Sequence, residues 1–130
     1  MSSKTDYWLE SAADDLITAK AMLDAKRLLW SGFICHLVAE KALKAVIADK
    51  TDELPPKIHD LKVLAKRGGV MDDLSEEQLA LLEQLNPLQI EARYPEHKDK
   101  VAQTLTPEKC QKIFSETEGF LCWIKQRLDK

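Results

Sequence analysis

The sequence lacks the features of secreted, membrane-spanning and strongly basic proteins. Its three cysteines, Cys35, Cys110 and Cys122, are an odd number, which favours reduced thiols in a cytoplasmic protein over a disulfide framework. The polar residues 1–6 do not resemble a signal peptide, and no apolar run approaches the roughly 20 residues of a membrane span. The formal net charge of −3 argues against a protein that coats nucleic acid, because such proteins are usually basic.

Motifs for metal ions, cofactors and nucleophilic catalysis are also missing. The Cys and His residues show neither C-x-x-C nor H-x-x-x-H spacing. The adjacent Gly68 and Gly69 are not followed by the Lys-Ser/Thr pair of a phosphate-binding loop. The few serines have no partners in a catalytic motif. We therefore expect no metal site and no cofactor.

Helical patterns are present along almost the whole chain. Its 130 residues have the size of one domain with a single core. Apolar residues recur at helical spacing, and no stretch alternates in the manner of a strand. We predict an all-α protein, an antiparallel up-and-down bundle of four main helices with one additional short helix, formed by residues 1–130 as a single domain.

The first two helices are predicted from apolar periodicity. Residues 5–27 carry a stripe with spacings of three and four residues, which is typical of a helix that buries one face; the stripe consists of Trp8, Ala12, Leu16, Ala19 and Leu23. A short turn is expected at residues 28–32. The central helix then runs to residue 49 and is apolar nearly all round, so neighbours should bury it on several sides.

Start and stop signals predict the remaining helices. Pro55 and Pro56 indicate a loop, and a short helix from residue 59 to 67 should end at the glycine pair that follows. Ser75-Glu-Glu-Gln78 has the form of a capping box, and this helix should end before Pro87. Thr106-Pro107 is the start signal of a last helix with a long apolar stripe.

The central helix carries His36, Glu40 and Lys44 at intervals of four residues. At about 100° per residue these three side chains lie in a narrow arc that also contains Phe33 and Leu37. Charged groups on a buried helix must be paired, or must face a cleft or a partner subunit. One interpretation is a solvated edge with an ion pair between Glu40 and Lys44. The other is a cleft at a two-fold dimer interface, which would cover the apolar residues of the arc.

The segment Arg93-Tyr94-Pro95-Glu96-His97 is the strongest candidate for a ligand site. Pro95 can open a short helix, and its unpaired N–H groups attract anions close to His97. Arg93 offers a planar donor fork for phosphate, and Tyr94 could stack on a base. A histidine with its pKa near neutrality, such as His97, could also move protons. In the alternative interpretation Arg93 pairs with a neighbouring glutamate and Tyr94 packs in the core.

His59 and Asp60 stand at the start of the predicted short helix. An aspartate in the first turn of a helix is favoured by the helix dipole. The histidine ring at this position can form local hydrogen bonds. We expect the pair to anchor the preceding loop to the helix, and a ligand-binding role is the alternative.

Together these segments resemble the HEPN domain, a helical module often encoded beside minimal nucleotidyltransferases in prokaryotes. The resemblance covers roughly residues 7–128, with three motifs in order: Ala39-Glu40-Lys41-Ala42-Leu43-Lys44-Ala45, His59-Asp60-Leu61 and Ala92-Arg93-Tyr94-Pro95. Many members carry a glutamine pair where this chain has His36-Leu37. The ribonuclease branch has four to six residues between its Arg and His, whereas Arg93 and His97 are separated by three.

The resemblance implies a homodimer that binds a nucleotide or RNA and serves a minimal nucleotidyltransferase, as its substrate-binding subunit or as the toxin of a toxin–antitoxin pair. It implies that Arg93, Tyr94 and His97 contact phosphate or base. The cleft beside them would be shaped by further ligand-binding residues, namely His36, Glu40, Lys44, His59 and Asp60. A non-enzymatic dimeric scaffold remains an alternative. So does a metal-independent ribonuclease with Arg93 and His97 as catalytic residues, which the short Arg–His spacing disfavours.

Overall fold

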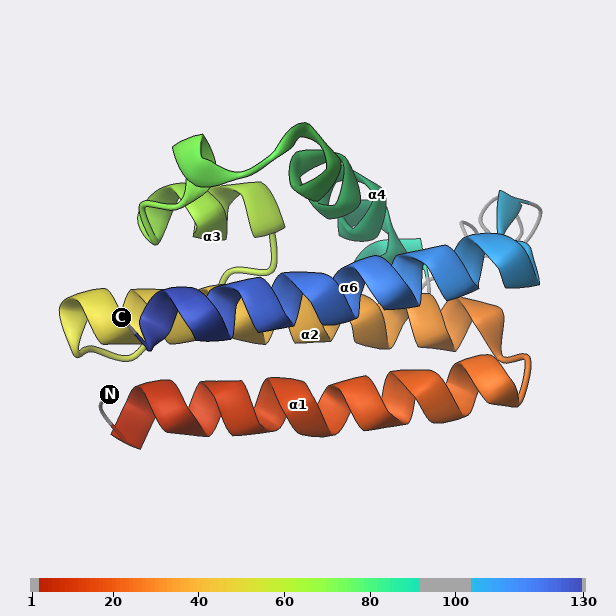
Figure 1. Ribbon diagram of the computed structural model, residues 1–130, viewed down its shortest axis with the longest axis horizontal. Coiled ribbons are helices and arrows are strands. Elements are labelled where there is room, and N and C mark those ends of the chain that lie inside the picture. Colours follow the sequence, from red (N-terminus) through yellow and green to blue (C-terminus); the bar gives the residue numbers. More distant parts are fainter. Residues whose placement is uncertain (1–2, 92–103, 130) are drawn as a thin grey trace.

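The fold is all-α, as predicted. The computed structural model describes residues 3–91 and 104–129, and these ranges contain helices and no strand. The helices are α1 (Ser3–Asp24), α2 (Leu28–Thr51), α3 (Leu61–Arg67), the 3₁₀ turn η1 (Met71–Asp73), α4 (Glu76–Glu91) and α6 (Pro107–Leu128). The three long helices α1, α2 and α6 lie side by side, and α3 and α4 cover one side of them (Figure 1).

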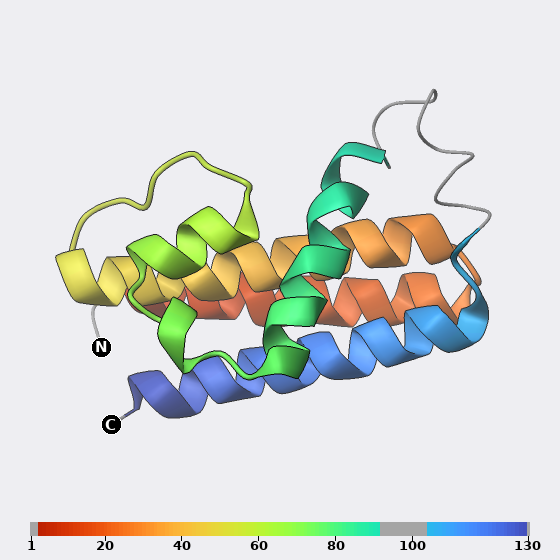
Figure 2. The same ribbon diagram turned by 90° about the horizontal axis from the view of Figure 1, so that it is seen from above.

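The finer prediction of a four-helix up-and-down bundle is not confirmed. Figure 2 shows that α4 lies obliquely across α2 instead of running alongside the three long helices. The short α3 follows the other half of α2. None of the described helices is long and apolar enough to cross a lipid bilayer.

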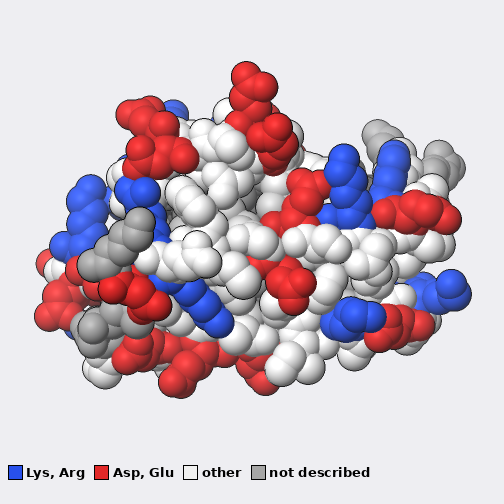
Figure 3. Space-filling model, viewed as in Figure 1, with Lys and Arg blue, Asp and Glu red and all other residues white. Residues whose placement is uncertain are grey.

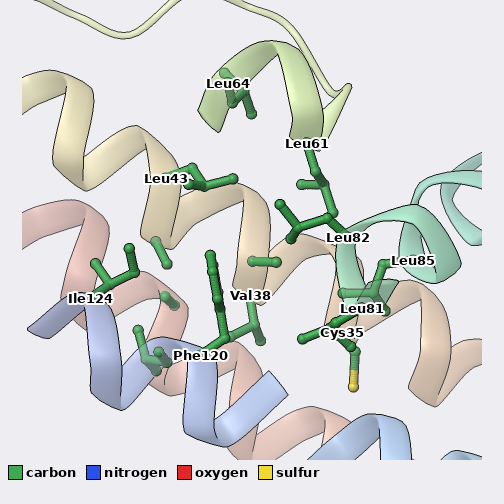
Figure 4. Packing of buried hydrophobic residues seen from close by; sticks show 14 of the residues in the cluster. Cys35, Val38, Leu43, Leu61, Leu64, Leu81, Leu82, Leu85, Phe120 and Ile124 are labelled. Atoms are coloured by element: carbon green, nitrogen blue, oxygen red, sulfur yellow. The ribbon is translucent and has the colours of Figure 1, made fainter. Parts of the chain in front are cut away.

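Helix α2 is the centre of the core, because it packs against α1, α3, α4 and α6. Its burial on several sides agrees with its lack of a broad polar face. The neighbouring helices contribute large apolar side chains that are almost fully buried (Figure 4); these include Leu61 and Leu64 from α3, Leu82 and Leu85 from α4, and Phe120 and Ile124 from α6. This packing holds α2 in place relative to the four helices that surround it.

The predicted turn at residues 28–32 is wrong, because α2 already begins at Leu28. The chain reverses at residues 25–27, where Lys26 adopts a left-handed conformation with φ of 61°. Gly32 lies inside α2 and has a packing role. A Cβ atom at this position would lie 2.9 Å from Leu88 Cδ1, so the glycine lets α4 approach α2 closely.

The predicted capping signals are confirmed. Ser75 Oγ accepts a hydrogen bond from Gln78 N at 3.0 Å, and Gln78 Oε1 accepts from Ser75 N at 2.9 Å. Thr106 Oγ1 accepts from Lys109 N at 3.1 Å at the start of α6. These bonds satisfy backbone N–H groups that the first turn of a helix leaves unpaired.

The predicted end of α4 before Pro87 is wrong, because the helix continues to Glu91. A proline inside a helix removes one backbone hydrogen bond. Both Pro87 and Glu83, whose carbonyl loses its partner, are exposed. Water can therefore bind this carbonyl, which lowers the cost of the proline.

The three cysteines carry free thiols, as predicted, and two of them are buried. Burial raises the pKa of the Cys35 thiol to about 12, and it raises the pKa of Cys110 as well. A thiol with so high a pKa stays protonated at neutral pH and reacts poorly. Cys35 and Cys110 are therefore small apolar groups of the core.

Candidate functional site

A buried carboxylate, that of Glu40, lies at the centre of the candidate site. Helix α2 places His36, Glu40 and Lys44 on successive turns, and their exposed fractions are 0%, 5% and 6%. Lys44 Nζ donates to Glu40 Oε2 at 2.9 Å, and His59 Nδ1 lies 3.1 and 3.2 Å from the two carboxylate oxygens. The interpretation of these residues as a solvated edge is therefore wrong. We call His36, Glu40, Lys44 and His59 the ionic cluster.

Lys44 has a second partner on α1. Its Nζ lies over the ring of Trp8, 5.5 Å from the ring centroid. The negative face of an aromatic ring attracts a cation, most strongly where water is excluded. The sequence identified Trp8 only as part of the apolar stripe of the first helix. Its indole also helps to hold a charged group beneath the surface.

His36 fixes the backbone of the segment that precedes α3. Its Nε2 lies 2.9 Å from the carbonyl oxygen of His59. A carbonyl can only accept, so Nε2 donates this bond. The other ring nitrogen, Nδ1, lies 3.6 Å from Glu40 Oε1. Helix α2 therefore holds His59 twice, at its main chain through His36 and at its ring through Glu40.

Asp60 is the N-cap of α3, which confirms the predicted anchoring role. Its Oδ1 accepts hydrogen bonds from Lys62 N at 2.9 Å and from Val63 N at 3.2 Å. It also accepts from Asn86 Nδ2 of α4 at 3.3 Å, and Asn86 Oδ1 accepts from Leu61 N at 2.9 Å. Asn86 was not among the predicted site residues, although an asparagine next to a proline within a helical segment was a usable signal. This residue ties α4 to the start of α3.

A hollow of about 230 Å³ opens beside the ionic cluster, between the start of α3 and the second half of α4. Its lining consists of His59, Asp60, Asn86, Pro87 and Gln89. The side chain of His59 is 47% exposed, so it joins the buried carboxylate of Glu40 to this surface. Of the residues predicted to shape a cleft, His59 and Asp60 line this hollow, whereas His36, Glu40 and Lys44 are buried.

The predicted catalytic residues Arg93 and His97, together with Tyr94, lie outside the described residues. Their roles stay predictions. Helix α4 ends at Glu91, shortly before them in the chain. The same helix contributes Asn86, Pro87 and Gln89 to the hollow.

One face of α2 carries apolar side chains that are only half-buried. These are Trp30, Phe33, Ile34 and Leu37, and we call them the open face. The rings of Trp30 and Phe33 meet edge to face with centroids 5.9 Å apart. Lys41, at the end of this face, forms an ion pair with Asp15 of α1 at 2.6 Å. The open face is therefore apolar with a charged margin.

Charges of both signs are spread over the face of the molecule that is drawn in Figure 3. Figure 3 shows Lys and Arg side chains interspersed with Asp and Glu, and they form no continuous basic area on the face that is drawn. This distribution agrees with the net charge of −3. Binding of an extended nucleic acid through its phosphates would need a basic stripe.

The fold and the ionic cluster define a small helical domain with a local polar site between α2, α3 and α4. A family model of the HEPN domain matches residues 5–128. The chain belongs to the HEPN domain family. This membership indicates a nucleotide- or RNA-related function, and HEPN domains often dimerise and associate with nucleotidyltransferases. Comparisons with curated proteins and with solved structures gave no significant match.

Proposed function

We propose that this protein is a nucleotide-binding accessory protein that works with a minimal nucleotidyltransferase. It would serve as the substrate-binding subunit of that enzyme or as the toxin of a toxin–antitoxin pair. The observation that carries the proposal is the ionic cluster, in which α2 buries a carboxylate and connects it to a hollow through His59. Family membership supports a nucleotide or RNA as the class of ligand.

The cost of burying charge supports a functional role for the ionic cluster. Apolar residues of similar volume would often stabilise a core as well as a buried ion pair does. Glu40 and Lys44 are nonetheless almost fully buried. His59, which is hydrogen-bonded to Glu40, lines the hollow. Polar groups that are held in fixed positions at a concave surface are typical of ligand sites.

Nucleotide binding is tested by thermal denaturation. We expect a nucleotide at millimolar concentration to raise the melting temperature, because a ligand that binds only the folded state stabilises it. The variant Arg93→Ala should lose this shift while the unliganded protein keeps its melting temperature. Arg127→Ala is the matched control, because Arg127 lies on α6 and pairs with Asp73 at the surface. It should retain the full shift.

Two results would contradict this proposal. The first is the absence of any shift with all four ribonucleotides. The second is unfolding of Arg93→Ala without ligand, which would make Arg93 a structural residue.

We further propose that the protein is a homodimer whose subunits meet at the open face of α2. Its four large apolar side chains are half-buried in one chain, and a second copy would remove them from water. The charged pair of Lys41 and Asp15 at its margin would lie at the rim of such an interface.

The oligomeric state is measured by light scattering. We expect a mass of twice the 14.8 kDa chain at micromolar concentration. Leu37→Glu should give the mass of one chain, because a charge on the open face cannot be buried without a partner. Ile17→Glu is the control, since Ile17 is 71% exposed on α1 and lies away from this face. A wild-type protein that stays monomeric would refute the dimer.

A further inference from the structure

His59 lines the hollow, and Glu40 holds one nitrogen of its ring. Nδ1 lies 3.1 and 3.2 Å from the carboxylate oxygens, which can only accept, so Nδ1 carries the proton. In the neutral ring Nε2 then carries a lone pair. Among residues 3–91 and 104–129, no side chain or backbone group forms a hydrogen bond with this Nε2. His59 is thus an oriented acceptor at the edge of the hollow.

Asp60, the next residue, adds a second acceptor. All three of its hydrogen bonds within the described part of the chain end on Oδ1, with Lys62 N, Val63 N and Asn86 Nδ2 as donors. Its Oδ2 takes no part in them, although the side chain lines the hollow. The N-cap bonds hold the carboxylate in place, so Oδ2 is also fixed in direction.

The size and charge of the hollow restrict what it can bind. Its volume of about 230 Å³ is below the roughly 300–1,000 Å³ of pockets that enclose whole drug-sized ligands. Among the described residues its lining contains a carboxylate and no lysine or arginine, so a phosphate group would be repelled. Hydroxyl groups, in contrast, can donate to both acceptors. The lining therefore suits a small moiety with neighbouring hydroxyls.

We infer that the hollow binds the ribose of the nucleotide, with its 2′- and 3′-hydroxyls donating to Asp60 and His59. This inference rests on the proposed nucleotide binding and adds the part of the ligand that is recognised here. A carboxylate that accepts from a ribose hydroxyl also serves dinucleotide-binding folds. The 2′-hydroxyl is the group by which a protein distinguishes ribonucleotides from deoxyribonucleotides.

The experiment compares the four ribonucleoside triphosphates with their 2′-deoxy and 3′-deoxy forms by isothermal titration calorimetry. We expect the deoxy form that loses the bond to the Asp60 carboxylate to bind about ten- to a hundredfold more weakly than the ribonucleotide. The deoxy form that loses the bond to the neutral His59 ring should bind about two- to tenfold more weakly. Asp60→Asn should lower the affinity for the ribonucleotide and leave that for at least one deoxy form unchanged. His59→Phe should reduce the preference in the same way.

Asp60→Asn is suited to this test, because asparagine caps a helix as well as aspartate does and the fold should persist. Asp49→Asn, at an exposed position of α2, is the matched control and should keep the preference. Equal affinities of the wild type for ribonucleotides and deoxyribonucleotides would overturn the ribose inference alone. Failure to bind any nucleotide would overturn the proposed function and this inference with it.

Discussion

Replacing Glu40 by alanine is expected to lower the free energy of unfolding by about 3–5 kcal/mol, which is typical when one partner of a buried ion pair is removed. The carboxylate accepts from Lys44 Nζ at 2.9 Å and from the ring of His59. Both Glu40 and Lys44 are almost fully buried, so water cannot replace the lost partner. Among the described residues, the ring of Trp8 would still attract the ammonium group.

The origin of this loss is identified by a second variant. Glu40→Leu combined with Lys44→Met removes both charges and keeps apolar volume, so it should be less destabilising than Glu40→Ala alone. Urea unfolding at one fixed protein concentration measures both differences. A loss below about 1 kcal/mol for Glu40→Ala would show that the pair behaves like a surface ion pair, contrary to its burial.

Phe120→Ala is expected to cost a similar amount, about 3–5 kcal/mol of unfolding free energy. The Phe120 side chain is 1% exposed and comes from α6 into the cluster formed with α2 and α4 (Figure 4). Its removal takes away buried apolar contacts and leaves a cavity that a core supported by several helices cannot close. The ring of Trp123, with its centroid 6.0 Å away, would lose a neighbour as well.

The control for this cavity is an aromatic residue at the surface. Tyr7 is 63% exposed and contacts Trp8 edge to face. Tyr7→Ala should therefore cost less than about 1 kcal/mol in the same urea experiment. Equal losses for Phe120→Ala and Tyr7→Ala would mean that α6 is not packed into the core as described.

The helices could be predicted where their signals are local. The capping box at Ser75 and the Thr106-Pro107 start depend on residues three positions apart or fewer, so the sequence contains the whole interaction. The prediction of a turn at residues 28–32 was wrong, because the role of Gly32 depends on a contact that is not local. Gly32 acts as a point of close approach to Leu88, and that contact joins helices that are distant in the sequence.

The candidate site shows the same division. The spacing of His36, Glu40 and Lys44 along one helix was sufficient to place them on one face of that helix. The bonds of Asn86 to Leu61 and Asp60 depend on how α4 crosses α2, and no local pattern contains this angle. The hollow itself could therefore not be predicted, although His59 and Asp60 were identified.

The connection between α2 and α3 is held by a hydrogen bond at each of its ends. Lys4 Nζ donates to the carbonyl oxygen of Asp52 at 2.7 Å, and His36 holds the carbonyl of His59. Between these two points Leu54 is 78% exposed. Lengthening a surface loop costs little entropy when its ends are already fixed. Added residues or a fluorescent label near Leu54 would thus leave the ring of His59 in its place beside Glu40.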